Sequence, residues 1–157
     1  MATVTMRGSD AVAASLAECY VTVGKNRYNF MQMINFEARI TKNKNTVPIL
    51  GQTGKGNKAN GWTGTFKGKA HYNQSVFRKM LLEYKVTGED VYFDIQVTNN
   101  DPASEAGKQT VVFTGCNIDG GVLAKFDAEG EYLSEEISGT FEDFKIPDRF
   151  KLLDGMK

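Results

Sequence analysis

The sequence contains few of the residues from which metal centres and disulfide frameworks are built. Its 157 residues include one histidine, His71, and two cysteines, Cys19 and Cys116. A structural zinc site takes four ligands drawn mainly from cysteine and histidine, which this composition does not supply. Two cysteines allow one disulfide, but free cysteine is among the most buried residue types, so we favour two reduced, buried thiols. No metal and no cofactor is predicted.

Long apolar runs are also missing. No stretch approaches the roughly 18 apolar residues that a membrane-spanning helix needs. The N-terminus lacks the basic-then-apolar pattern of a secretory signal, although residues 11–17 are small and apolar. We therefore expect synthesis in the cytoplasm and no insertion of the chain itself into a membrane.

Motifs that would indicate an enzyme are weak. Residues 51–58 (GQTGKGNK) approach a phosphate-binding loop, but Gly56 follows Lys55 where Ser or Thr is required. The next regular element is expected to be a strand, so no helix N-terminus is available to hold a phosphate. Glu135 and Glu136 are adjacent on an expected strand and therefore point to opposite faces rather than into one cleft. We predict no catalytic residues and no enzymatic activity.

Most of the chain shows strand patterning. Residues 74–86 form the one expected helix, with Val76, Met80 and Tyr84 on one face and Gly88 just past its end. The expected strands are 18–23, 27–41, 62–72, 90–98, 108–116, 118–126 and 132–144. A single short helix needs a sheet to cover its apolar face. We predict a mainly β fold, an antiparallel β-sandwich or barrel of about seven strands with one flanking α-helix, as one domain over residues 1–157.

Three segments depart from an ordinary small domain. Residues 1–16 are small or polar and read as a flexible N-terminal arm. The strand expected at 27–41 is much longer than the usual five or six residues. Residues 42–60 read as a long loop, rich in Lys, Asn and Gly, with an apolar centre at 47–50. Because loops of this length are usually functional or disordered, the apolar centre suggests docking on a partner.

The net charge of zero conceals an uneven distribution. Residues 1–88 hold 13 basic and 4 acidic side chains, a net charge of +9, and residues 89–157 hold 6 basic and 15 acidic ones, a net charge of −9. Either the two halves neutralise each other within one fold, or they reach different surfaces and attract other copies of the chain. A general nucleic-acid binder is not expected, because the acidic half would repel phosphate.

The order of several short segments resembles a known family. These segments are residues 61–68 (GWTGTFKG), 76–82 (VFRKMLL), 94–97 (DIQV), 100–102 (NDP) and 141–144 (FEDF). Together they are similar to tail tube proteins of contractile-tailed phages and defective prophages of Gram-positive bacteria, and of related phage-tail-like bacteriocins. The resemblance covers roughly residues 26–150.

The resemblance implies a structural, self-assembling protein. Members of the family form hexameric rings that stack head to tail into a hollow tube inside a contractile sheath. The implied partners are further copies of the chain, the sheath protein, the baseplate or tube initiator and the tail terminator. The lumen would conduct DNA without specific binding, or ions in a bacteriocin. The implied location is the tail of the particle, after assembly in the bacterial cytoplasm.

The resemblance also suggests which residues make these contacts. The inter-subunit loop would use Val47, Pro48, Ile49, Leu50, Lys55 and Lys58. The lumen would be lined by residues of two strands, with an acidic contribution from the second: Asn35, Glu37, Arg39, Glu131, Glu135, Glu136 and Glu142. Which face of the first strand meets the lumen depends on its register. The alternative is a small-molecule-binding β-barrel with a helical lid, which predicts monomers, an apolar cavity and a short, ordered loop at 42–60.

Overall fold

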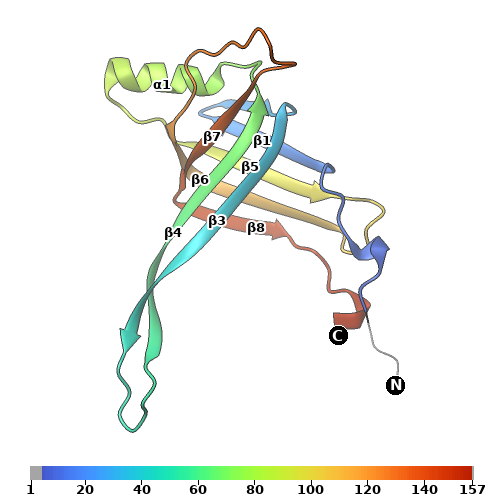
Figure 1. Ribbon diagram of the computed structural model, residues 1–157, viewed down its shortest axis with the longest axis vertical. Helices are drawn as coiled ribbons and strands as arrows, with labels where there is room; N and C mark the ends of the chain where they lie inside the picture. The colour runs from blue at the N-terminus through green and yellow to red at the C-terminus, as the bar shows by residue number, and fades with distance from the viewer. Residues whose placement is uncertain (1–4, 157) are drawn as a thin grey trace. The chain divides into compact units, whose positions relative to one another are not determined.

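The computed structural model describes residues 5–156, and within them the protein is mainly antiparallel β-sheet with a single α-helix (Figure 1). This confirms the predicted fold class. The elements in chain order are η1 (Gly8–Asp10), β1 (Ala17–Val23), β2 (Asn26–Asn29), β3 (Met33–Val47), β4 (Gly56–His71), α1 (Val76–Thr87), β5 (Phe93–Asn100), β6 (Lys108–Gly120), β7 (Ser134–Phe141), β8 (Asp143–Asp148) and η2 (Asp154–Met156).

The chain divides into two compact units. Unit 1 contains the described residues up to Met31 together with residues 92–115 and 143–156, and unit 2 contains residues 32–91 and 116–142. The division falls inside β6, whose first part belongs to unit 1 and whose last residues belong to unit 2.

Unit 1 is a sheet in the order β2-β1-β5-β6, and β8 pairs with β6 as well. Its apolar interior includes Val21, Phe93, Ile95 and Phe113, all less than 9% exposed. The chain before β1 is bound to the turn after β5. The Ala13 amide donates to Asp101 Oδ2 at 3.0 Å, the Glu105 amide to the Ser9 carbonyl at 3.2 Å, and the Asn100 amide to the Leu16 carbonyl at 3.1 Å. Residues 9–16 of the expected arm are therefore docked on unit 1, and residues 1–4 lie outside the described part.

Unit 2 is built on the antiparallel strands β3, β4 and β7, with the end of β6 beside β7. Each row across its buried face sets an aromatic or branched side chain beside a glycine or alanine. The rows are Phe36–Gly68–Ile137, Ala38–Phe66–Gly139 and Ile40–Gly64–Phe141. The glycines are required, because a Cβ on Gly139 would lie 2.1 Å from the Asn117 carbonyl oxygen and one on Gly64 would lie 2.4 Å from the Phe141 ring. The aromatic rings therefore fill the space that the glycines leave.

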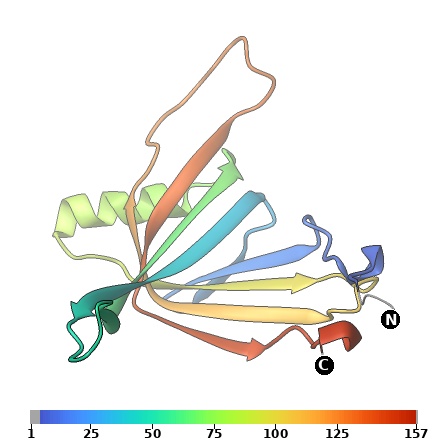
Figure 2. The same cartoon turned by 60° about the horizontal axis from the view of Figure 1, so that its bottom comes forward.

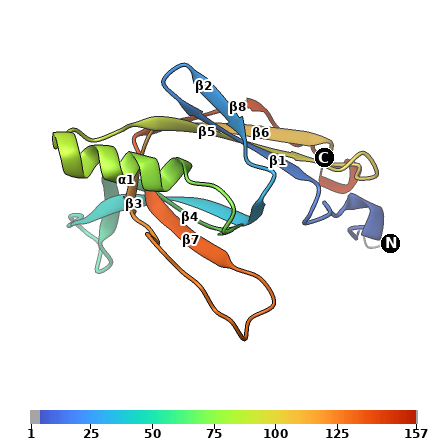
Figure 3. The same cartoon turned by 90° about the horizontal axis from the view of Figure 1, so that it is seen from above.

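Helix α1 is part of unit 2 and runs near β4 and β7 (Figure 3). Gly88 ends it as predicted, in the left-handed conformation (φ 75°) with its amide bonded to the Tyr84 carbonyl. The N-cap position is Ser75, but Gln74 does the capping, its Oε1 accepting from the Val76 amide at 2.7 Å. The predicted apolar face is only partly right: Met80 is buried, whereas Tyr84 is 52% exposed.

Four predicted segment boundaries are wrong. The strand expected at 27–41 is broken at residues 30–32, where Phe30 turns inward to 3% exposure and its amide bonds the Cys19 carbonyl. The strands expected at 108–116 and 118–126 are the single strand β6 followed by an irregular segment at 121–133. The strand expected at 132–144 is interrupted at Glu142, between β7 and β8.

The fourth correction concerns residues 42–60, which are not an irregular loop. They form a β-hairpin, called here the assembly hairpin, made of the end of β3, a turn at 48–55 and the start of β4. Val47 pairs with Gly56 and Asn45 with Lys58. Both faces of this two-stranded ribbon are exposed to solvent, so the apolar alternation that marks a half-buried strand is missing from its sequence.

Neither Cys19 nor Cys116 forms a disulfide within the described residues. Cys116 is fully buried in β6, and Cys19 is half-buried in β1. Burial raises the pKa of the Cys19 thiol to about 11, because removal from water disfavours the thiolate.

Candidate assembly surfaces

The assembly hairpin projects from the packed part of unit 2, beyond the strands of its sheet (Figures 1 and 2). The start of the free ribbon is marked by a β-bulge, where the β3–β4 register shifts between Lys42 and Lys44. Gly61 lies at this shift with φ 96°, a conformation that favours glycine. Bulges increase local strand twist, so this glycine helps to set the direction in which the hairpin leaves the sheet.

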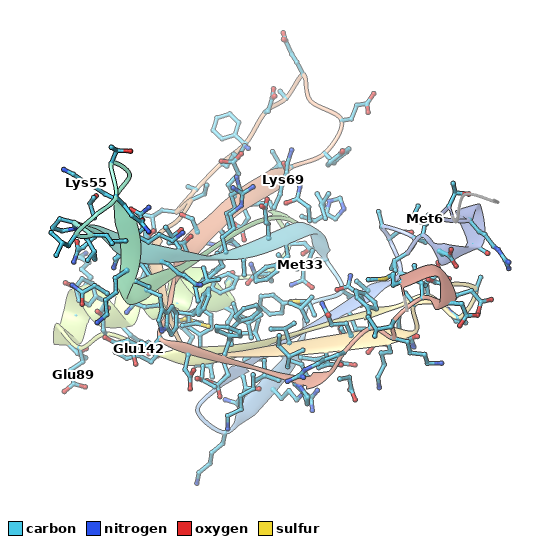
Figure 4. All side chains as sticks on the ribbon, turned by 90° about the horizontal axis from the view of Figure 1, so that it is seen from below. Met6, Met33, Lys55, Lys69, Glu89 and Glu142 are labelled. Carbon is cyan, nitrogen blue, oxygen red and sulfur yellow. The ribbon has the colours of Figure 1, made fainter. Side chains whose placement is uncertain are left out.

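The tip of the assembly hairpin is both apolar and basic. Leu50 is fully exposed, and Val47 and Ile49 are 38% and 41% exposed. The turn is closed by the Gln52 amide on the Ile49 carbonyl, and Gly51 takes a positive φ of 84°. Residues 42–60 carry four lysines and no acidic residue. The six residues predicted for inter-subunit contact all lie on this hairpin and are exposed: Val47, Pro48, Ile49, Leu50, Lys55 and Lys58. Lys55 is seen at the tip in Figure 4.

A second candidate surface is the exposed face of β3, β4 and β7, called here the channel face. Directly paired residues point to the same side of a sheet. Three register rows make up this face, and all nine members are exposed: Asn35–Lys69–Glu136, Glu37–Lys67–Ser138 and Arg39–Thr65–Thr140. Four of the seven residues predicted to line the lumen are therefore brought together here: Asn35, Glu37, Arg39 and Glu136.

Charges on the channel face are paired rather than uniformly acidic. Glu37 forms an ion pair with Arg39 two residues along the same strand. Lys67 lies opposite Glu37 in the register, and Lys69 lies opposite Glu136. The face thus holds three basic and two acidic side chains among hydroxyl and amide groups, so the expected acidic contribution of β7 to this face is limited to Glu136.

The other three lumen candidates do not lie on the channel face. Glu135 is a correction: it is 4% exposed and points to the buried side of β7, where it forms an ion pair with Arg78 of α1. Its other oxygen accepts from Gln74 Nε2 at 2.7 Å. Glu131 lies in the irregular segment before β7, and Glu142 lies in the bend after it; both are exposed.

The exposed segment 121–133, called the acidic loop, is a surface that was not predicted from the sequence. It joins β6 to β7 and extends away from the sheet (Figure 2). Three of its large apolar side chains are exposed, Leu123 at 71%, Phe126 at 91% and Tyr132 at 67%. It also carries the acidic residues Asp127, Glu129 and Glu131, and one lysine. Its first residues alternate in the manner of a strand, and for that reason a strand was predicted over 118–126. The acidic residues that follow, together with Gly130, are the signal that favoured a loop.

The outer edge of β3 is a third feature. Among the described strands, β3 pairs with β4 alone, although it is 15 residues long. Such an edge presents backbone amide and carbonyl groups to solvent and is a template for pairing with another chain.

Two further findings concern the described residues 5–156. None of their helices is long and apolar enough to cross a membrane. Their His, Cys, Asp and Glu side chains do not gather in groups of three or more that could hold a metal ion.

Solved structures support the fold. The chain is similar to a protein of the anti-feeding prophage baseplate, with a TM-score of 0.63 at 10% identity over 93% of this chain and 97% of that one. It is similar to the SPP1 tail tube, with a TM-score of 0.61 at 5% identity over 90% and 81% of the two chains. A sheath–tube complex of the extracellular contractile injection system PVC gives 0.57 at 12% identity over 82% and 86%.

Closer relatives exist in Bacillus subtilis (strain 168). The phage-like element PBSX protein XkdM is 35% identical over 114 residues, which are 73% of this chain and 78% of XkdM. The uncharacterized protein YqbM is 35% identical over 116 residues, which are 74% of this chain and 79% of YqbM. The family model described as phage tail tube protein matches residues 4–148. With most of its length matched by that model, the chain belongs to the phage tail tube protein family.

Proposed function

We propose that this chain forms hexameric rings that stack head to tail into the inner tube of a contractile tail, with the sheath protein outside, a baseplate or initiator at one end and a terminator at the other. The channel face lines the lumen, through which DNA passes without specific binding. Assembly takes place in the bacterial cytoplasm, and the chain catalyses no reaction. The particle is a phage, a defective prophage or a related phage-tail-like bacteriocin.

The observation that carries this proposal, beyond the family, is the long unpaired edge of β3. An exposed edge strand of this length is an aggregation hazard unless something covers it. In a ring, a strand of the next subunit pairs with it, and the ring closes so that no edge remains. One face of each paired strand then lines the lumen, and the opposite face carries the packed rows of aromatic and glycine residues.

The channel face suits the passage of a polyanion. Its two carboxylates lie beside the three basic side chains in the ion pair and the register described above, so the face keeps a net charge of only +1 per copy. Binding of nucleic acid to a protein rises with the number of phosphates that basic groups neutralise. A surface of largely compensated charge and hydroxyl groups therefore holds DNA weakly and lets it slide.

The small-molecule-binding barrel is not favoured. The family is one of structural tube proteins, and the segment that the alternative needs as a short loop is the extended assembly hairpin. A cleft of about 320 Å³ does lie beside α1, lined by Met80, Leu81 and Tyr84 among others, but it is open to solvent.

Size-exclusion chromatography and negative-stain electron microscopy test the proposal. We expect the purified chain to form rings and, at higher concentration, tubes. The variant Val47→Asp/Ile49→Asp should remain folded but form no tubes, because it places two charges on the exposed apolar tip. The matched control Leu82→Asp/Val86→Asp adds the same charges to exposed positions of α1 and should still form tubes. A wild-type chain that stays monomeric at all concentrations would refute the tube.

Thiol labelling tests the channel face separately. In the variant Thr65→Cys, a small maleimide should label monomers and tubes alike, whereas a maleimide attached to a protein wider than the bore should label monomers only. In the variant Leu82→Cys, on α1, the large reagent should label both forms. Equal labelling of the Thr65→Cys variant by the large reagent in tubes and monomers would place the channel face outside.

A further inference from the structure

The assembly hairpin and the acidic loop lie at opposite ends of one strand. Gly56, where β4 begins after the hairpin turn, and His71, where β4 ends, are 15 residues apart, or about 50 Å at the usual rise of a strand. His71 pairs with Ser134, the residue that follows the acidic loop. Because both features belong to unit 2, this separation is a property of a single compact unit.

The two surfaces are complementary in charge. The assembly hairpin has four lysines and no acid, whereas the acidic loop has three acids and one lysine. The Nζ of that single lysine, Lys125, donates to the carbonyl of Ser134, the first residue of β7, at 2.9 Å. With Lys125 counted, the loop keeps a net charge of −2.

The two surfaces also match in polarity. Leu50 at the hairpin tip and Phe126 in the acidic loop are 103% and 91% exposed, which are high values for large apolar side chains. The charged residues of the hairpin around Leu50 are lysines, whereas those of the loop around Phe126 are mainly carboxylates, with Lys125 as the one exception. Two apolar patches of this kind, each rimmed by charge, are typical of interaction surfaces.

We propose that the assembly hairpin of one copy docks on the acidic loop of a second copy. This inference rests on the proposed function and names the partner surface for that hairpin. Because the two surfaces lie at opposite ends of β4, the contact is heterologous: each copy offers a hairpin at one end and an acidic loop at the other. Such a contact repeats along the strand direction without closing, which is the geometry that ring stacking needs.

A charge swap tests the pairing. The variant Lys55→Glu/Lys58→Glu should raise the critical concentration for tubes about fivefold or more, since two attractive pairs become repulsive. Asp127→Lys/Glu129→Lys should do the same. A chain with all four substitutions should return to within about twofold of the wild type, because the exchanged side chains at positions 55, 58, 127 and 129 again set opposite charges across the contact. The matched control Lys79→Glu/Lys85→Glu makes the same charge change on exposed positions of α1 and should leave tube formation unchanged.

Cross-linking tests the contact directly. A mixture of Leu50→Cys and Phe126→Cys chains should give disulfide-linked dimers on mild oxidation of assembled tubes, and neither variant alone should. The native thiols give little background, because Cys116 is buried and Cys19 is half-buried.

The outcomes separate this inference from the proposed function. Tubes that form from the wild type, with no rescue by the four-fold variant, would overturn the hairpin–loop pairing and leave the tube intact. Disulfides formed by Leu50→Cys alone would also overturn it, since they would mean that two tips meet. A wild type that forms no tubes would refute the proposed function, and the pairing with it.

Discussion

The ion pair between Arg78 and Glu135 fixes α1 to β7 inside unit 2, and its removal should be costly. The side chain of Glu135 is 3% exposed and that of Arg78 is 17% exposed. Arg78 also donates to the Val122 carbonyl at 3.2 Å, and its guanidinium lies 4.4 Å from the centre of the Tyr72 ring. One side chain thus joins the helix to β7, to the acidic loop and to the segment after β4.

The substitution Arg78→Met keeps most of the apolar stem but leaves a buried carboxylate without its cation. Breaking a buried pair in this way usually costs about 3–5 kcal/mol. Gln74 still donates to Glu135, so we place the loss near the lower end, at about 3 kcal/mol. Glu135→Gln should cost about 1–2 kcal/mol, because Arg78 keeps its carbonyl and ring contacts and some access to water.

The double variant Arg78→Met/Glu135→Gln leaves no unpaired charge and should cost about 2 kcal/mol, well below the sum of the single losses. Urea unfolding measures all three, in the Val47→Asp/Ile49→Asp background so that tube formation does not contribute. Trp62 is the only tryptophan and lies in unit 2, 6.0 Å from Phe141 between ring centres, so its fluorescence reports the unfolding of that unit. In a thermal scan, Arg78→Met should lower Tm by about 10 °C. A loss under about 1 kcal/mol for Arg78→Met, with single losses that simply add, would refute the reasoning.

Three other predictions concern packing, assembly and the thiol. Gly139→Ala should destabilise unit 2 by about 2–4 kcal/mol in the same urea assay, because its Cβ would collide with the Asn117 carbonyl and the Phe66 ring. If the variant were as stable as the wild type, the strands would have to shift freely to make room for the methyl group. Tube formation, followed by light scattering, should weaken as salt rises from about 0.05 to 0.5 M, because screening shortens the range of surface charges. Scattering that does not change with salt would mean that apolar burial alone drives assembly. Cys19 should react with a thiol reagent at pH 8 about 100-fold more slowly than a free thiol, because its pKa is about 11 rather than 9.0. The folded state keeps this proton to higher pH than the unfolded state, so the contribution of Cys19 to the free energy of unfolding should fall as pH rises from 9 to 11, and Cys19→Ser should remove that dependence.

The fold class was predictable because its strongest signals are local. Alternation in β4 and β7, and the glycine that ends α1, depend on neighbouring residues only. The assembly hairpin was missed as structure because a ribbon exposed on both faces has no buried side to impose alternation. The break at Phe30 was missed because continuous alternation does not reveal where the chain leaves one sheet for another.

The candidate surfaces were predictable in part. Exposed apolar residues at 47–50 stand out in a basic segment, so the hairpin tip could be selected from the sequence. The residues of the channel face could be identified only once the strand register was known. The register brings Glu136 beside Lys69 and turns Glu135 inward. Burial of Glu135 could not be foreseen, because its partner Arg78 is 57 residues away in the chain.

The assembly hairpin also affects how the protein bears a mechanical load. Its two strands do not stop where the packed sheet begins: β3 and β4 run from the turn at 48–55, through the β-bulge between Lys42 and Lys44, into the rows of aromatic and glycine residues. A tensile load on the tip, directed along these strands, shears the β4–β7 ladder and strains its hydrogen bonds together rather than one after another. A tube that must withstand a load along its axis gains stiffness from such strands, because paired β-strands, and not an irregular loop, connect the loaded tip to the packed interior.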